Sequence, residues 1–143
     1  MIMYLTKQLS SKEKRQVTRY LRQYKKIDAI IQSKQMDLMP NITSTLNDIA
    51  VQTSNGFHSE AEEYTIKVME IDEYVRIKKK LDLAYNSVKD VQRIIWDEHY
   101  IEGHSDTDVY YGNDINKRTY YREKRELILL TAEILNIGTK THQ

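Results

Sequence analysis

A group of basic and hydroxyl-bearing residues near the C-terminus carries the strongest chemical signal in this sequence. The run from Ile115 to Arg125 reads INKRTYYREKR. Guanidinium and ammonium groups bind phosphate, and an arginine can also pair with guanine through two parallel hydrogen bonds. These residue types therefore indicate the binding of a nucleic acid. The candidate binding residues are Asn116, Lys117, Arg118, Thr119, Tyr121, Arg122, Lys124 and Arg125.

A helix that starts after Asn116 would place these side chains on one face. Asn116 is a favourable N-cap, because its side chain can accept hydrogen bonds from the free N–H groups of the first turn. At about 100° per residue, one side of this helix collects apolar side chains and the opposite side collects arginines. The inner side holds Tyr120, Leu127, Thr131 and Ile134, and the outer side holds Arg118, Arg122 and Arg125.

The outer side chains divide into two expected roles. Arg118 and Arg122 are the best candidates for base edges, because arginine reads guanine bidentately. The remaining cations and the tyrosine are expected to hold phosphates, which fix the position of a protein on DNA without reading its sequence. These are Lys117, Tyr121, Lys124 and Arg125.

A shorter helix is predicted just upstream. Residues 105–111 are long enough for two helical turns, and Gly112, Asn113 and Asp114 favour a tight turn after them. A short helix, a turn and a longer helix with a basic outer face form the layout of a helix-turn-helix, whose second helix enters the DNA major groove. The alternative interpretation is an ordinary amphipathic terminal helix with a solvated charged face.

The rest of the chain predicts further helices. Ser10 and Glu13 form a capping box that starts an amphipathic helix reaching about Gln35, before the break at Pro40. The face opposite its apolar stripe is either a solvated face, a second phosphate-contacting surface or a partner for the acidic residues downstream. This face holds Arg15, Arg19, Arg22 and Lys26.

Two more helix starts follow. Ser59 begins a second capping box and a helix to about Tyr85, and Ser87 with Asp90 can cap a third helix that ends near Tyr100. With one Pro and four Gly in 143 residues, the sequence predicts an all-α protein. The expected division is an N-terminal amphipathic helix over residues 1–39, a connector over 40–58, a long central helix over 59–85 and a helix-turn-helix domain over 86–143.

Composition excludes several classes of function. The chain has no cysteine, hence no disulfide, thiolate metal site or cysteine nucleophile, which fits a reducing cytoplasm. No apolar run is long enough to span a membrane, and the first residues do not resemble a signal peptide. The four histidines lack metal-ligand spacing, and no phosphate-binding glycine loop or catalytic triad motif is present. We therefore expect neither an enzyme nor a protein with a metal or cofactor.

The run from Ile115 to Arg125 resembles the C-terminal part of ArpU/RinA-type transcriptional regulators of phages and prophages of Gram-positive bacteria. These regulators end in a helix-turn-helix similar to region 4 of sigma factors. Upstream, residues 91–100 look like the preceding helix of the same unit, and residues 17–31 look like the N-terminal helix of the family. The chain departs from the family pattern at Tyr110, Asn113 and Asp114, in and after the first helix of the motif.

The resemblance implies a sequence-specific regulator that binds double-stranded promoter DNA in the bacterial cytoplasm and activates late genes for packaging or structural proteins. The alternative is a helical adaptor that binds RNA polymerase or another phage protein without touching DNA. We also expect a homo-oligomer, most simply a dimer, formed through the N-terminal half. Its apolar stripes are Val17, Leu21, Tyr24, Ile27 and Ile31 on one helix and Tyr64, Val68, Ile71 and Val75 on the other.

Overall fold

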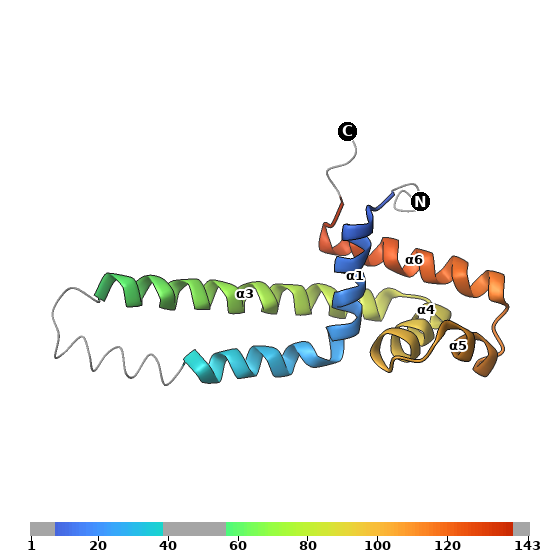
Figure 1. Ribbon diagram of the computed structural model, residues 1–143, viewed down its shortest axis with the longest axis horizontal. Coiled ribbons are helices and arrows are strands. Elements are labelled where there is room, and N and C mark those ends of the chain that lie inside the picture. Colours follow the sequence, from blue (N-terminus) through green and yellow to red (C-terminus); the bar gives the residue numbers. More distant parts are fainter. Residues whose placement is uncertain (1–7, 39–56, 139–143) are drawn as a thin grey trace. The chain divides into compact units, whose positions relative to one another are not determined.

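The computed structural model describes residues 8–38 and 57–138 (Figure 1). Within these ranges every regular element is a helix, which confirms the predicted all-α class. The predicted connector lies outside the described residues except for its last two positions. In chain order the elements are α1 (Ser11–Gln23), the 3₁₀ turn η2 (Tyr24–Lys26), a helix over residues 27–38, α3 (Phe57–Ser87), α4 (Asp90–Ile94), the π-helix η3 (Ile95–Ile101), α5 (Asp106–Gly112) and α6 (Lys117–Leu135).

The described residues form two compact units. The first, here called the C-terminal unit, combines the chain up to Lys25 with everything from Lys79 onward. The second consists of residues 26–78. α1 therefore shares a unit with α4, η3, α5 and α6, against which it packs through η3 and α6.

The N-terminal helix begins as predicted but is interrupted earlier. Ser10 Oγ accepts from the Glu13 N–H, and the Glu13 carboxylate accepts from the Ser10 N–H, so the capping box is present. The single helix to Gln35 that the sequence predicts is wrong, because a 3₁₀ turn over Tyr24–Lys26 divides it. The cause is tertiary: the Leu21 carbonyl, in the last turn of α1, accepts from the Trp96 indole N–H at 2.9 Å.

Three aromatic rings surround this hydrogen bond. Trp96 is fully buried, and the ring centroids of Tyr24, Tyr85 and Trp96 lie 5.1 Å from one another, a distance typical of favourable aromatic pairs. The Tyr24 hydroxyl donates to Asp82 at 2.6 Å, and the Tyr85 hydroxyl donates to Asp97 at 2.9 Å. The aromatic cluster thus joins α1, η2, α3 and η3 while each ring keeps its polar atom bonded.

The helix predicted from Ser87 to about Tyr100 differs from the prediction in its N-cap and in its helical geometry. Lys89, rather than Ser87, is the N-cap of α4, because Ser87 is the last residue of α3 and its hydroxyl donates back to Ala84. From Ile95 to Ile101 the chain adopts π-helical geometry, which the periodicity did not predict. The wider turn places Ile95, Trp96 and Tyr100 together in the core of the C-terminal unit.

The second unit pairs α3 with the helix over residues 27–38. α3 begins at Phe57, two residues before the predicted start, and ends at Ser87 rather than Tyr85. Lys34 lies 3.7 Å from Glu70, and Lys78 lies 3.4 Å from Asp28, so ion pairs connect the two helices. No helix among the described residues is long and apolar enough to cross a membrane.

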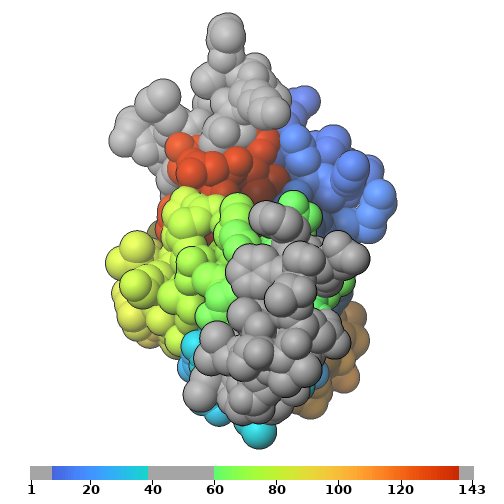
Figure 2. All heavy atoms as spheres, turned by 90° about the vertical axis from the view of Figure 1, so that its left-hand side faces the viewer, coloured from blue at the N-terminus to red at the C-terminus, as the bar shows by residue number. Residues whose placement is uncertain are grey.

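The C-terminal end of α6 packs beside the start of α1, where red and blue atoms meet in Figure 2. α6 stops at Asn136, which adopts a left-handed conformation with φ of 62°. Gly138 follows with φ of 77°, and a Cβ there would lie 2.8 Å from Leu9. Only glycine therefore allows this close approach of residue 138 to Leu9 without displacing the Leu9 side chain.

We predict that Leu127→Ala lowers the free energy of unfolding by about 2–5 kcal/mol, because it leaves a cavity beneath α6. Leu127 is 0% exposed and lies on the stripe that the spacing predicted to be buried. Urea unfolding followed by circular dichroism would measure the change. Arg125→Ala, an exposed position on the same helix, is the control and should stay within about 0.5 kcal/mol of the wild type. Equal stability of the two variants would contradict this packing.

Candidate nucleic-acid interface

The turn between α5 and α6 is set by local hydrogen bonds. Ser105 Oγ accepts from the Asp108 N–H and caps α5. Asn116 Oδ1 accepts from the N–H groups of Arg118 at 2.9 Å and Thr119 at 3.3 Å, which confirms the predicted N-cap of α6. Between them Asp114 has φ of 57°, the left-handed conformation that a short polar side chain tolerates.

The outer side of α6 is exposed as its spacing predicted. Arg118, Arg122 and Arg125 are exposed, whereas Tyr120 and Leu127 are fully buried. Of the other candidates, Asn116, Lys117 and Tyr121 are exposed, and Thr119 is half-buried. Within the part of the chain that the structure describes, neither Arg118 nor Arg125 forms an ion pair, so their charges face solvent.

Lys124 has a more restricted position than the other candidates. Its side chain is only 20% exposed, and its ammonium donates to the Asp106 carboxylate at 2.9 and 3.1 Å. The same carboxylate accepts from the Tyr120 hydroxyl at 2.6 Å, and His99 Nδ1 lies 3.4 Å from it. Asp106 therefore connects η3, α5 and α6 through one carboxyl group.

The surroundings of Asp106 and Tyr120 shift the pKa of both side chains. Partial burial alone would raise the pKa of Asp106, but the hydrogen bonds from Tyr120 and Lys124 and the nearby positive charge outweigh it and lower that pKa below 3.8. Burial raises the pKa of Tyr120, and its bond to Asp106 raises it further. Tyr120 thus remains a hydrogen-bond donor while Asp106 remains an acceptor at neutral pH.

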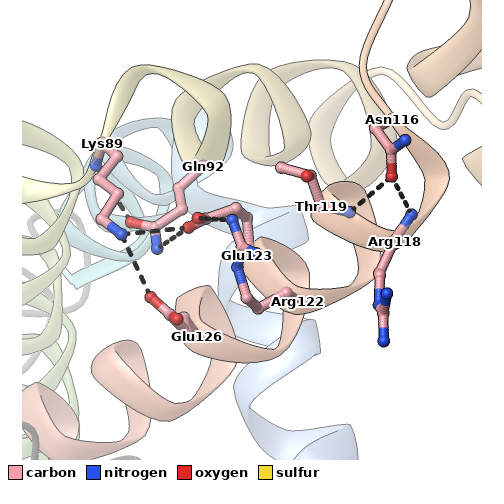
Figure 3. A network of polar contacts seen from close by, with 8 residues as sticks. All are labelled: Lys89, Gln92, Asn116, Arg118, Thr119, Arg122, Glu123 and Glu126. Atoms are coloured by element: carbon pink, nitrogen blue, oxygen red, sulfur yellow. Dashed lines mark hydrogen bonds and ion pairs between the residues drawn. The ribbon is translucent and has the colours of Figure 1, made fainter.

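A second polar network lies on the inner side of α6 (Figure 3). Glu123 is 5% exposed and accepts from Gln92 Nε2 at 3.0 Å. Gln92 Oε1 in turn accepts from the Lys89 N–H at the start of α4. The Lys89 ammonium lies 3.5 Å from both Glu123 and Glu126, and these carboxylates raise its pKa.

This network also restrains one candidate binding residue. Arg122 Nη2 lies 3.3 Å from the other carboxylate oxygen of Glu123, so its guanidinium is held beside the helix although its side chain is 53% exposed. Figure 3 shows Arg118 near the start of α6, four residues before Arg122, with its guanidinium directed away from the Asn116 cap. The two arginines proposed for base edges therefore differ in how tightly the protein orients them.

Sequence reasoning missed both acidic anchors. Glu123 could have been found, because it stands three residues after Tyr120 and four before Leu127, on the buried stripe. Asp106 gave no such signal, since an acid in a first turn is common for electrostatic reasons alone. Among the described residues no three or more carboxylate and imidazole groups converge in a way that could hold a metal ion.

Tyrosine rings of α5 and α6 contact one another. The ring of Tyr110 lies 5.3 Å from that of Tyr120 and 6.2 Å from that of Tyr121, which joins α5 to α6. Tyr110, at which the chain departs from the regulator family pattern, is therefore a packing residue, 8% exposed. Tyr111 and Tyr121 are 75% and 43% exposed and offer hydroxyl groups at the surface.

One known protein is similar over most of the chain. It is the "Uncharacterized phage-related protein Lin1259/Lin1739" of Listeria innocua serovar 6a (strain ATCC BAA-680 / CLIP 11262), and the two are 31% identical over 125 residues. The aligned part covers 87% of this chain and 86% of the Listeria protein. No protein-family model matches the chain. No solved structure matches it.

We predict that Asp106→Asn destabilises the protein at pH 7, because Tyr120 and Lys124 lose a charged acceptor. The folded-state pKa of Asp106 lies below its ordinary 3.8, so its stabilising effect is complete above about pH 4 and is lost as the pH falls through the lowered value. Thermal unfolding from pH 7 to pH 2 should therefore show the gap between wild type and variant closing below pH 4.

The control is Asp108→Asn, which changes an exposed carboxylate on the same helix. It should leave the pH dependence of unfolding close to that of the wild type. A gap between Asp106→Asn and wild type that stays constant down to pH 2 would show that the Asp106 carboxylate does not stabilise the fold through its charge.

Proposed function

The chain belongs to the same family as the phage-related Listeria protein, and from that premise we propose that it is a sequence-specific DNA-binding transcriptional regulator of phage or prophage origin. The observation that carries the proposal is the exposed basic face of α6, which starts at a well-capped N-terminus and rests on a buried stripe. The resemblance to ArpU/RinA-type regulators supports the same function and adds the activation of late packaging or structural genes.

In the proposed mechanism, α6 enters the major groove of promoter DNA with its first turns. Arg118 has no acidic partner among the described residues and is free to pair with a guanine. Arg122, held by Glu123, approaches the bases with less freedom and therefore loses less rotamer entropy on binding. Lys117, Tyr121 and Arg125 contact phosphates beside the groove.

An adaptor that binds RNA polymerase without touching DNA is the second candidate. Exposed apolar side chains on α3 favour a protein contact there, since Ile66 and Met69 are 63% and 64% exposed. Such a contact and DNA binding would use different surfaces, so an activator could use both. The DNA test below discriminates the two functions, because an adaptor alone selects no DNA sequence.

We predict that Arg118→Ala weakens binding to the specific site by about 1–3 kcal/mol while leaving non-specific binding nearly unchanged. The site is first obtained by selecting bound duplexes from a random-sequence library, and affinities are then measured by fluorescence anisotropy at several salt concentrations. Arg76→Ala is the control, because Arg76 is an exposed arginine of α3 paired with Glu73. Its affinity should match the wild type.

Two results would overturn the regulator function. One is a wild-type protein that enriches no sequence from the library. The other is an enriched site that Arg118→Ala and Arg122→Ala both bind as tightly as the wild type. Capture of RNA polymerase by a protein with either result would favour the adaptor.

We also propose that the protein acts as a dimer, which lengthens the DNA site and so its specificity. The stripe from Val17 to Ile31 is buried within the chain and does not remain available for a second copy. Ile66 and Met69 lie three residues apart on one exposed face of α3 and are the better contact.

We predict that Met69→Glu shifts the protein from dimer to monomer in sedimentation velocity runs at micromolar concentration, because it places a charge in an apolar contact. Leu83→Glu is the matched control, since Leu83 is 66% exposed on the same helix and should leave the dimer intact. A wild-type protein that sediments as a monomer, both free and on its DNA site, would refute the dimer.

A further inference from the structure

The outward face of α1 carries a row of positive charge. Lys12, Arg15, Arg19 and Arg22 follow one another at spacings of three, four and three residues, which places them along one side of a helix. All four are exposed, whereas Val17 and Leu21 on the opposite side are fully buried. These four residues are here called the α1 row.

The charge of the α1 row is not neutralised by the described part of the protein. Glu13 is the one acidic residue of α1, and its carboxylate is used in the capping box with Ser10. None of the four cations forms an ion pair within the described ranges. Arg19 lies over the Tyr20 ring and Arg22 over the Tyr100 ring, contacts that orient a guanidinium without cancelling its charge.

The α1 row belongs to the same compact unit as α6. The Trp96 indole bond to Leu21 and the packing of α1 on η3 and α6 fix this helix within the unit. Tyr100 marks where the two basic surfaces approach: its ring centroid is 5.7 Å from the Arg22 guanidinium and 5.9 Å from the Lys124 ammonium. Lys124 lies 5.8 Å from the ring of the exposed Tyr121 on α6.

We propose that the α1 row binds the phosphate backbone of duplex DNA beside the site that α6 reads; this inference rests on the proposed function. From Lys12 to Arg22 the row is about 15 Å long. A DNA strand carries one phosphate per roughly 3.4 Å of helix axis and winds around that axis, so a row of this length can contact more than one successive phosphate of a strand. A contact of this kind adds affinity but no sequence preference.

The chemistry of the row favours DNA over an acidic protein surface. Beside the row lie Ser11, Gln16, Gln23 and the half-buried Tyr20, whose ring Arg19 covers, and no large apolar side chain is exposed on α1. Protein–protein contacts typically need a buried apolar or aromatic centre and have few charged residues there. Phosphate contacts need only cations and hydrogen-bond donors, which is what α1 presents.

The test compares Arg15→Gln/Arg19→Gln with Lys67→Gln/Lys79→Gln in the full chain. Both double variants remove two exposed positive charges, and glutamine preserves helix propensity, so circular dichroism and melting temperature should stay unchanged. Affinity for the selected site and for a scrambled duplex of equal length is measured from 50 to about 200 mM salt. In this range each phosphate contact contributes about 0.9 to the slope of log affinity against log salt.

If the α1 row binds phosphates, Arg15→Gln/Arg19→Gln lowers that slope by about 1.8 and weakens binding to both duplexes alike. The ratio of specific to non-specific affinity stays constant, and Lys67→Gln/Lys79→Gln keeps the wild-type slope. Equal slopes for the wild type and the α1 variant would overturn the inference. So would equal losses in the two double variants, which would indicate an effect of net charge alone.

The failure of this inference is separable from failure of the proposed function. If Arg118→Ala loses site preference while the α1 variant binds like the wild type, the regulator function stands and the α1 contact is refuted. If the wild type selects no sequence but the α1 variant still lowers the slope on scrambled DNA, the α1 contact stands and the regulator function is refuted. Loss of RNA polymerase capture with unchanged DNA binding would assign the row to a protein and overturn the inference.

Discussion

The hydrogen bond from the Trp96 indole to the Leu21 carbonyl is the interaction on which the C-terminal unit depends. Both groups are buried, and an indole N–H without a partner in that position would cost about 1–3 kcal/mol. The bond joins positions 75 residues apart and fixes α1 to η3. The last carbonyls of an α-helix have no hydrogen-bond partner within the helix. The Leu21 carbonyl, in the last turn of α1, accepts from the Trp96 indole, so the bond that allows Trp96 to be buried also satisfies a carbonyl at the end of α1.

This dependence explains which elements the sequence predicts and which it does not. The start of α1 at the Ser10 capping box and the start of α6 at Asn116 follow from contacts within four residues, and the structure shows both. The 3₁₀ turn at Tyr24–Lys26 and the π-helix after Ile94 depend on rings that meet only after folding. Periodicity treats a helix as uniform, so it has no means of locating where a tertiary contact changes the winding.

In the candidate site too, features set within one helix were predictable from the sequence, whereas contacts between helices were not. The spacing of Arg118, Tyr120 and Leu127 correctly predicted which side chains are exposed and which are buried, because α6 is a regular helix throughout. The partners of Lys124 and Arg122 could not be assigned in this way. Asp106 reaches Lys124 across the α5–α6 turn, and Glu123 is fixed by Gln92 from another helix. Such partners depend on the angle between helices, which a single sequence does not encode in its spacing.

The two acidic anchors have an effect on the charge of the surface. A chain with a net charge of +1 has no overall attraction for a polyanion, so any such attraction must come from local imbalance. Asp106 pairs with Lys124, Glu123 pairs with Arg122, and neither acid pairs with Arg118. The two acids thus restrain Lys124 and Arg122 and leave Arg118 and Arg125 without an ion pair among the described residues. A cation without an internal partner can neutralise a phosphate and release the counterions condensed on a nucleic acid, so the separation of paired from unpaired cations favours binding to a polyanion.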